Sequence, residues 1–172
     1  MKFLIASDIH GSAYWCQKMM DLIEKENPDK IILLGDILYH GPRNDLPREY
    51  APKAVIQQLS KIQDKIICVR GNCDAEVDQM VLPFPCMNEY TQLFADNRTF
   101  YCTHGHHENP DSLPKLSNDD IFLSGHTHIK CDNIIDGVRC LNPGSVSIPK
   151  DGTNSCLIYE NGVFTFCVLE DM

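Results

Sequence analysis

Short runs of apolar residues along the chain are each followed at once by glycine and polar side chains. The run at 31–34 (Ile-Ile-Leu-Leu) has no polar break and predicts a strand buried on both faces. Runs at 3–6 and 66–69 predict two further strands of this kind. Between these strands apolar residues recur at spacings of three and four, which predicts helices over 12–26 and from Pro52 onwards. The first two strands and their helix form a β-α-β unit with a right-handed crossover.

The second half of the chain has a different pattern, with short strands joined by tight turns. Asp136-Gly137 and Asn161-Gly162 are typical of two-residue hairpin turns, and Asp96-Asn97-Arg98 predicts another. The run at 121–124 predicts a short strand. We therefore expect an N-terminal β-α-β half and a β-rich C-terminal half, packed as a single domain over residues 1–172.

Composition and charge limit the classes of partner and the cellular compartment that we expect for this protein. The formal net charge of −9 disfavours a surface for long nucleic acid or anionic membrane, because both attract basic patches. No stretch approaches the roughly 18 apolar residues of a membrane span, so we expect no membrane partner. Nine cysteines without a CxxC pair are typical of a reducing compartment, and the N-terminal apolar run meets Asp8 and His10 too soon for a signal peptide. We expect a cytoplasmic protein.

Polar residues that can bind a metal ion follow five of the predicted strands. These sets are Asp8-x-His10, Gly35-Asp36, Gly71-Asn72, His104 and Gly125-His126-x-His128. Strand ends of one sheet lie side by side, so we expect the five sets to converge. In an extended turn, Asp-x-His and His-x-His place both side chains on one side. Carboxylate, amide and imidazole ligands together suit Mn²⁺, Fe²⁺, Zn²⁺, Co²⁺ or Ni²⁺ better than Mg²⁺ or Ca²⁺. Because a carboxylate has two oxygens, we expect Asp36 to bridge two metal ions.

In this order the five blocks closely resemble the calcineurin-like metallophosphoesterase family. The Arg-Gly-Asn-Cys-Asp block at 70–74 and the Asn-Pro-Gly-Ser stretch at 142–145 are similar to its small bacterial and archaeal phosphodiesterase branch. The resemblance implies an α/β fold, a four-layer α/β/β/α sandwich of two mixed β-sheets flanked by helices. It also implies two divalent metal ions per chain, with Mn²⁺ expected first. One ion would be held by Asp8, His10, Asp36 and His128, and the other by Asp36, Asn72, His104 and His126.

The expected reaction follows from that metal pair. Two cations about 3.5–4 Å apart lower the pKa of a bridging water, so that hydroxide can attack phosphorus near neutral pH. We expect hydrolysis of a small-molecule phosphodiester by this route. A phosphomonoesterase would use the same core, and assays of both ester types separate the two. A catalytically silent protein-interaction scaffold is a third alternative, but scaffolds are expected to have broken metal ligands, and here all seven are present.

Cys73 departs from the family pattern, because many relatives have a histidine directly after the Gly-Asn pair. A thiol, with a reference pKa of about 8.5, is a weak acid at neutral pH and a poor hydrogen-bond donor. Either the leaving group needs little protonation, or another residue such as His106 supplies the proton. Cys73 itself either contacts substrate or only lines the site. Asn72, Cys73 and His106 are therefore the candidate catalytic residues.

Several neighbouring residues leave alternatives open. Arg70 either clamps a phosphate oxygen or pairs with a surface carboxylate, and Asp74 either orients a ligand or caps a helix. His40 and His107 are interpreted as loop histidines. The apolar stretch at 80–84 is either a packed edge or a contact in a homo-oligomer, for which the family resemblance suggests a dimer or tetramer.

Overall fold

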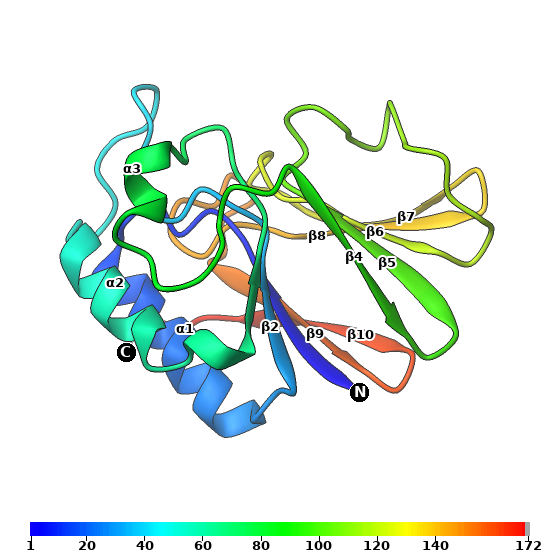
Figure 1. The fold of residues 1–172 in the computed structure, drawn as a ribbon, viewed down its shortest axis with the longest axis horizontal. Helices are drawn as coiled ribbons and strands as arrows, with labels where there is room; N and C mark the ends of the chain where they lie inside the picture. Colours follow the sequence, from blue (N-terminus) through cyan, green and yellow to red (C-terminus); the bar gives the residue numbers. More distant parts are fainter. Residues whose placement is uncertain (171–172) are drawn as a thin grey trace.

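Two five-stranded β-sheets face each other in the computed structural model, which describes residues 1–170 (Figure 1). The first sheet has the strand order β10-β9-β1-β2-β3. Its three N-terminal strands run parallel to one another, β9 pairs antiparallel with β1, and β10 pairs antiparallel with β9. These strands are β1 (Lys2–Ala6), β2 (Lys30–Leu33), β3 (Ile66–Cys68), β9 (Ser155–Glu160) and β10 (Val163–Val168). The C-terminal hairpin thus completes the sheet that the N-terminal half begins.

The second sheet is also mixed and has the order β4-β5-β6-β8-β7. Its central strands β5, β6 and β8 are parallel, and the edge strands pair with them antiparallel. The bounds are β4 (Tyr90–Ala95), β5 (Arg98–Thr103), β6 (Ile121–Leu123), β7 (Lys130–Ile135) and β8 (Val138–Pro143). All three predicted hairpin turns are confirmed, and the two mixed sheets confirm the predicted fold class.

Strand alternation divides the core into layers. In β1, Phe3 and Ile5 point toward the second sheet, where they pack in one cluster with Phe100 and Leu123. The alternate residues Leu4 and Ala6 belong to the cluster on the opposite face of the first sheet. Each residue of β1 after Lys2 is buried, as expected for a strand covered on both faces.

Two helices cover the outer face of the first sheet (Figure 1). They are α1 (Ala13–Glu26) and α2 (Pro52–Ser60). Ser12 caps α1 as predicted, because its hydroxyl accepts the N–H of Trp15 at 3.3 Å. Asn27 ends the helix in the left-handed region, with φ of 43°. Both predicted helices are therefore confirmed.

The outer face of the second sheet is covered by a loop. Tyr101 and Phe122 on that face pack against Leu113 and Leu116 from the loop at 104–120. Helical cover of the sandwich is thus confined to the first sheet in the described part of the chain, whereas the family resemblance implied helices on both sides. The two short helices are η1 (Gln63–Lys65) and α3 (Glu76–Gln79).

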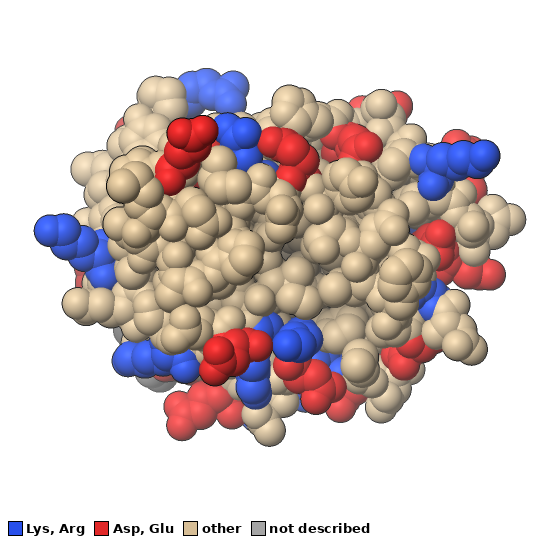
Figure 2. Space-filling view, viewed as in Figure 1, with Lys and Arg blue, Asp and Glu red and all other residues tan. Residues whose placement is uncertain are grey.

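The surface and the helices give three results that bear on partners. Across the face shown in Figure 2, acidic and basic side chains lie around the rim, and the middle carries no continuous basic track. Within residues 1–170, no helix is both long and apolar enough to cross a membrane. In the apolar stretch at 80–84, Leu82 and Phe84 are buried, whereas Met80 is 83% exposed and Val81 is 47% exposed. A homo-oligomeric contact there remains a prediction.

Candidate metal centre

The carboxyl ends of five strands meet at one end of the sandwich, and every predicted ligand lies directly after one of them. The ligands follow β1 (Asp8, His10), β2 (Asp36), β3 (Asn72), β5 (His104) and β6 (His126, His128). Backbone hydrogen bonds join these turns across strands: His10 N–H donates to the Asp36 carbonyl at 2.9 Å, and Gly125 N–H donates to the His104 carbonyl at 2.8 Å. The predicted convergence of the five strand ends is confirmed, but they come from two sheets and not from one, because the facing sheets bring β5 and β6 to the same end of the sandwich as β1, β2 and β3.

Five of the seven predicted ligands lie in the left-handed backbone region. Their φ angles are 59° at Asp8, 48° at His10, 56° at Asp36, 66° at His126 and 61° at His128. The expected extended turns are therefore wrong: tight left-handed turns, not an extended backbone, direct the paired side chains inward. Such conformations cost about 1–3 kcal/mol each in non-glycine residues and cluster at functional sites.

Three histidine rings are fixed by hydrogen bonds from Nδ1 to backbone carbonyls. A carbonyl only accepts, so Nδ1 carries the proton, and in the neutral ring Nε2 presents a lone pair to the centre. The Nδ1 donors and their acceptors are His10 with Tyr39 O at 2.7 Å, His104 with Leu34 O at 2.6 Å, and His128 with Ile148 O at 2.7 Å.

The atoms that face one another at the centre are all electron-rich. Nε2 of His10 lies 3.3 Å from Nε2 of His128, and these two nitrogens lie 3.5 Å and 3.2 Å from Oδ1 of Asp8. No donor among the described residues satisfies that fully buried oxygen. Donor atoms spaced in this way fit around one cation with bonds of about 2.0–2.2 Å. The residues present therefore fit a metal ion.

The electrostatics of the cluster favour a cation in the same place. Burial acts to raise the pKa of Asp8, but the neighbouring His10 and His128 rings outweigh it and hold that pKa well below its usual value. Burial acts to lower the pKa of His104, but Asp36 and Asp8 raise it to about 9. Two buried carboxylates therefore remain charged, and each needs positive charge nearby.

Asp36 faces both halves of the centre. Its Oδ2 lies 3.6 Å from Nε2 of His10 and 3.5 Å from Nε2 of His104. Its Oδ1 accepts the backbone N–H of Cys73 at 2.8 Å. Burial acts to raise the pKa of Asp36, but the His104 ring lowers it overall. One ionised oxygen thus lies between two imidazole nitrogens, which is the arrangement that a bridging ligand requires.

In the second half of the centre, formed by Asn72, His104 and His126, the candidate ligand atoms are not all close together. Asn72 Oδ1 lies 3.0 Å from Nε2 of His104, while its amide nitrogen donates to Sγ of Cys73 at 3.2 Å, so the thiol turns the amide oxygen inward. The His126 ring lies 5.1 Å from the His104 ring and lines the cavity that opens over the ligands. Its nitrogens lie outside the tight groups of ligand atoms found in the described residues. Its backbone N–H donates to Asp8 Oδ2 at 3.1 Å.

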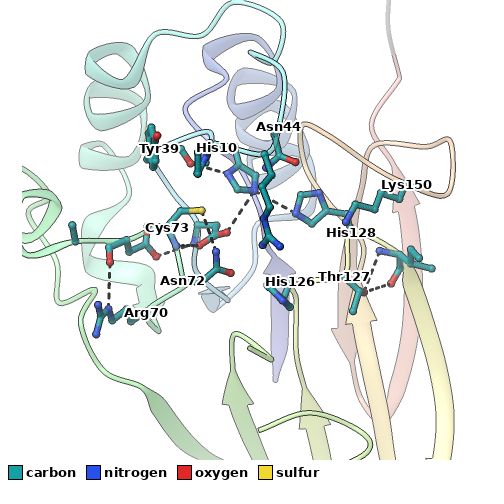
Figure 3. A pocket seen from close by; sticks show the side chains of 17 residues that line it. His10, Tyr39, Asn44, Arg70, Asn72, Cys73, His126, Thr127, His128 and Lys150 are labelled. Carbon is teal, nitrogen blue, oxygen red and sulfur yellow. Dashed lines mark hydrogen bonds and ion pairs between the residues drawn. The ribbon is translucent and has the colours of Figure 1, made fainter. Parts of the chain in front are cut away.

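A cavity of about 1000 Å³ opens over this centre (Figure 3). Cys73 lines it, and burial followed by the charge of Asp36 raises the pKa of that thiol to about 12. His106 does not line it, and its ring lies against that of His107, with centroids 4.0 Å apart and the ring planes tilted by 42°. Burial and the neighbouring His104 lower the pKa of His106 to about 4. Of the two candidates for the leaving-group proton, only Cys73 reaches the cavity.

Two open alternatives are resolved by hydrogen bonds. Asp74 accepts the backbone N–H groups of Asp36, Ile37 and Gly71 at 2.8, 2.9 and 2.7 Å, so it orients the ligand Asp36. The helix-cap alternative is wrong, because the residue before α3 is Ala75. Arg70 forms an ion pair with Glu89 at 3.1 Å, so pairing with a surface carboxylate is confirmed, although Arg70 also lines the cavity.

Sequence reasoning missed the support that the 142–147 loop gives to the centre. The hydroxyls of Ser145 and Ser147 donate to the Asp8 carbonyl at 2.9 and 3.1 Å, and the Asn142 amide donates to the Gly125 carbonyl at 2.7 Å. Small polar residues in a turn carry no signal of which strand end they contact. Arg43 and Lys150, which also line the cavity, were missed because each is a lone basic residue in a loop.

The family model for the calcineurin-like phosphoesterase superfamily domain matches residues 1–161. The chain therefore belongs to this superfamily.

Its relatives include phosphodiesterase YfcE of Escherichia coli strain K12, to which it is 41% identical over 172 residues, covering 99% of this chain and 94% of the relative. A solved structure of that E. coli phosphoesterase superposes with a TM-score of 0.94 and 38% identity, covering 99% of this chain and all of the other. A phosphodiesterase of Methanocaldococcus jannaschii is 25% identical, covering 99% of this chain and 93% of the relative. The chain is thus a YfcE-type metallophosphoesterase.

Proposed function

We propose that this protein is a phosphodiesterase that hydrolyses small phosphodiesters with two bound divalent metal ions. The observation that carries the proposal is the position of Asp36 Oδ2, within 3.6 Å of the inward-facing nitrogens of both His10 and His104. The names of the E. coli and M. jannaschii relatives support the diester as the substrate class. Mn²⁺ is the first metal to test, with Ni²⁺, Zn²⁺, Fe²⁺ and Co²⁺ as alternatives for the same nitrogen and oxygen donors.

The ligand roles divide along the two sides of Asp36. Asp8, His10 and His128 would hold one ion together with Asp36, since their donor atoms form one tight group. Asn72, His104 and His126 would hold the other with Asp36, after His126 turns its ring toward His104. When bound, the two ions supply an activated water as nucleophile and offset the charge of the phosphate.

The cavity walls bind and position the ester. Arg43 and Lys150 line the cavity, and neither has an ion-pair partner in the described part of the chain, so both are available to a phosphate oxygen. Cys73 contacts the substrate from the opposite wall as a neutral thiol. The leaving group therefore departs with little help from a protein acid, which favours ester arms that are stable as anions. A role for His106 remains a prediction.

We also propose a cellular location, and we weigh two alternative functions. Nine free cysteines support a reducing compartment such as the cytoplasm. A phosphomonoesterase would share the metal ligands, and the parallel monoester assay below separates it. A non-catalytic scaffold is disfavoured by the intact ligand set.

The test is hydrolysis of bis(4-nitrophenyl) phosphate by metal-stripped protein after separate addition of Mn²⁺, Ni²⁺, Zn²⁺, Co²⁺ and Mg²⁺. The matching monoester is assayed in parallel. We expect diester turnover with a transition metal and its loss with a chelator. Faster turnover of the monoester would make the protein a phosphomonoesterase, and no turnover of either ester by folded, metal-loaded protein would overturn the enzymatic function.

A further inference from the structure

A second cavity, of about 420 Å³, adjoins the one over the metal ligands. Three residues line both cavities: Tyr39, Cys73 and Ala75. In Figure 3, Tyr39 and Cys73 lie together on one side of the larger cavity, away from His128 and Lys150. A ligand whose phosphate lies over the metal ligands can therefore extend past Tyr39 and Cys73 into the second cavity.

The second cavity is built for a flat apolar group. Its walls are aromatic and aliphatic side chains, principally Tyr39, Tyr50, Ile56, Val77 and Val81. The ring of His40 contacts both tyrosine rings edge-on, at centroid distances of 4.8 and 5.2 Å, and so holds the two aromatic walls in place. Lys53 and Asp78 supply the charged groups of the lining. Aromatic walls of this kind bind aromatic ligands by stacking and edge-to-face contact.

Exposure and size agree with a small aromatic occupant. Val77 is 61% exposed and Val81 is 47% exposed, although both are apolar and lie beside the cavity. Clustered exposed apolar residues mark binding sites. A cavity of about 150 Å³ holds benzene, so the larger volume here accommodates a fused ring.

We propose that the second cavity binds an aromatic group carried on one ester arm of the phosphodiester. This inference rests on the proposed diesterase function and narrows its substrate class to diesters with an aromatic arm. Cys73 has a specific part in it: as a short side chain in the shared wall, it leaves the two cavities in contact and lets the arm pass.

The test compares two non-hydrolysable anions, (naphthalen-2-ylmethyl)methylphosphinate and ethylmethylphosphinate, by calorimetry on metal-loaded protein. We expect the aromatic anion to bind at least about tenfold more tightly to the wild type. The double variant Val77→Glu, Val81→Glu places charge in the apolar walls and should bring the two affinities to within about threefold. The matched control is Val163→Glu, Val168→Glu on β10, where the valines are 62% and 53% exposed and the change of charge is the same. It should keep the wild-type ratio.

Equal affinities of the wild type for the two anions would overturn the proposal, and so would an equal loss of the ratio in both double variants. A separate arm uses 2-naphthalenemethanol and metal-stripped protein, where no hydrolysis takes place. Binding that the Val77→Glu, Val81→Glu variant abolishes would support an aromatic site even if no diester is turned over. Failure of the aromatic site and failure of the phosphodiesterase function therefore give different results.

Discussion

The carboxylate of Asp74 accepts the backbone N–H of Asp36 at 2.8 Å. The same carboxylate also accepts the N–H groups of Ile37 and Gly71, so it fixes the turn from which Asp36 reaches both halves of the metal centre. Burial raises the pKa of Asp74, and the three N–H donors act against that rise. Asp74 thus has no direct part in binding metal, but it sets the position of the residue proposed to bridge the two ions.

Asp74→Ala should destabilise the metal-free protein and weaken metal binding. The change leaves three buried N–H groups without an acceptor, at about 1–3 kcal/mol each, so we expect a loss of at least about 3 kcal/mol in the free energy of unfolding. Urea unfolding in chelator measures it. The control is Asp132→Ala, which removes a surface pair with Arg139 and should cost less than about 1 kcal/mol. Similar losses in the two variants would contradict the role assigned to Asp74.

Gly71→Ala should abolish turnover while the fold persists. A Cβ at this position would lie 2.0 Å from Oδ1 of Asp36 and 2.4 Å from its backbone nitrogen, so the bridging carboxylate must move. We expect diester turnover to fall at least about 100-fold, since a shift of about 1 Å in a reacting group has that effect. Gly152→Ala is the control, because its Cβ meets nothing within 4 Å and only its φ of 86° is strained. It should lose about 1–2 kcal/mol of stability and keep its activity.

Asp36→Asn should remove most of the stabilisation that metal gives. Wild-type protein at a Mn²⁺ concentration of 100 times its dissociation constant should gain about 2.7 kcal/mol over the chelated protein. The variant keeps an acceptor for the Cys73 N–H but loses the charge that faces His10 and His104, so we expect a gain below about 1 kcal/mol. Thermal unfolding with and without Mn²⁺ measures both. An undiminished shift in the variant would mean that Asp36 does not bind the metal.

Three of the nine cysteines should react with iodoacetamide in the native protein. Cys73, Cys131 and Cys167 are partly exposed, and the other six are buried. Iodoacetamide must reach the sulfur atom, so accessibility separates the two groups; burial raises the pKa of Cys73 to about 12, so we expect it to react more slowly than Cys131 and Cys167. Mass spectrometry after brief labelling counts the modified residues. Rapid labelling of all nine without denaturant would show that the core described here is wrong.

The strands, turns and ligands were predictable from the sequence because each has a local signal. The apolar run at 31–34 and the Asp136-Gly137 turn specify their own structure, and the five strand-end motifs specify which side chains gather. That β9 and β10 return to pair beside β1 depends on contacts between distant segments, and no short stretch of sequence records it.

The finer geometry of the centre was not predictable for the same reason. The left-handed turns at Asp8 and Asp36 are held by hydrogen bonds from other loops: Ser145 donates to the Asp8 carbonyl, and Asp74 accepts the Asp36 N–H. The sequence leaves the role of Asp74 open, because an aspartate before a short helix looks the same whether it caps that helix or reaches across to another strand end. Only the folded structure shows that Asp74 accepts three backbone N–H groups and therefore positions Asp36.

The central claim, that two metal ions share Asp36 and hydrolyse a phosphodiester together, is tested most directly by a stoichiometric titration. Metal-stripped protein at a concentration far above the dissociation constant receives Mn²⁺ in small steps, and the initial rate of bis(4-nitrophenyl) phosphate hydrolysis is measured at each step. We predict little activity up to one equivalent per chain, a steep rise between one and two, and a plateau from two onward. A plateau reached at one equivalent, or a rate independent of added metal, would contradict the shared centre.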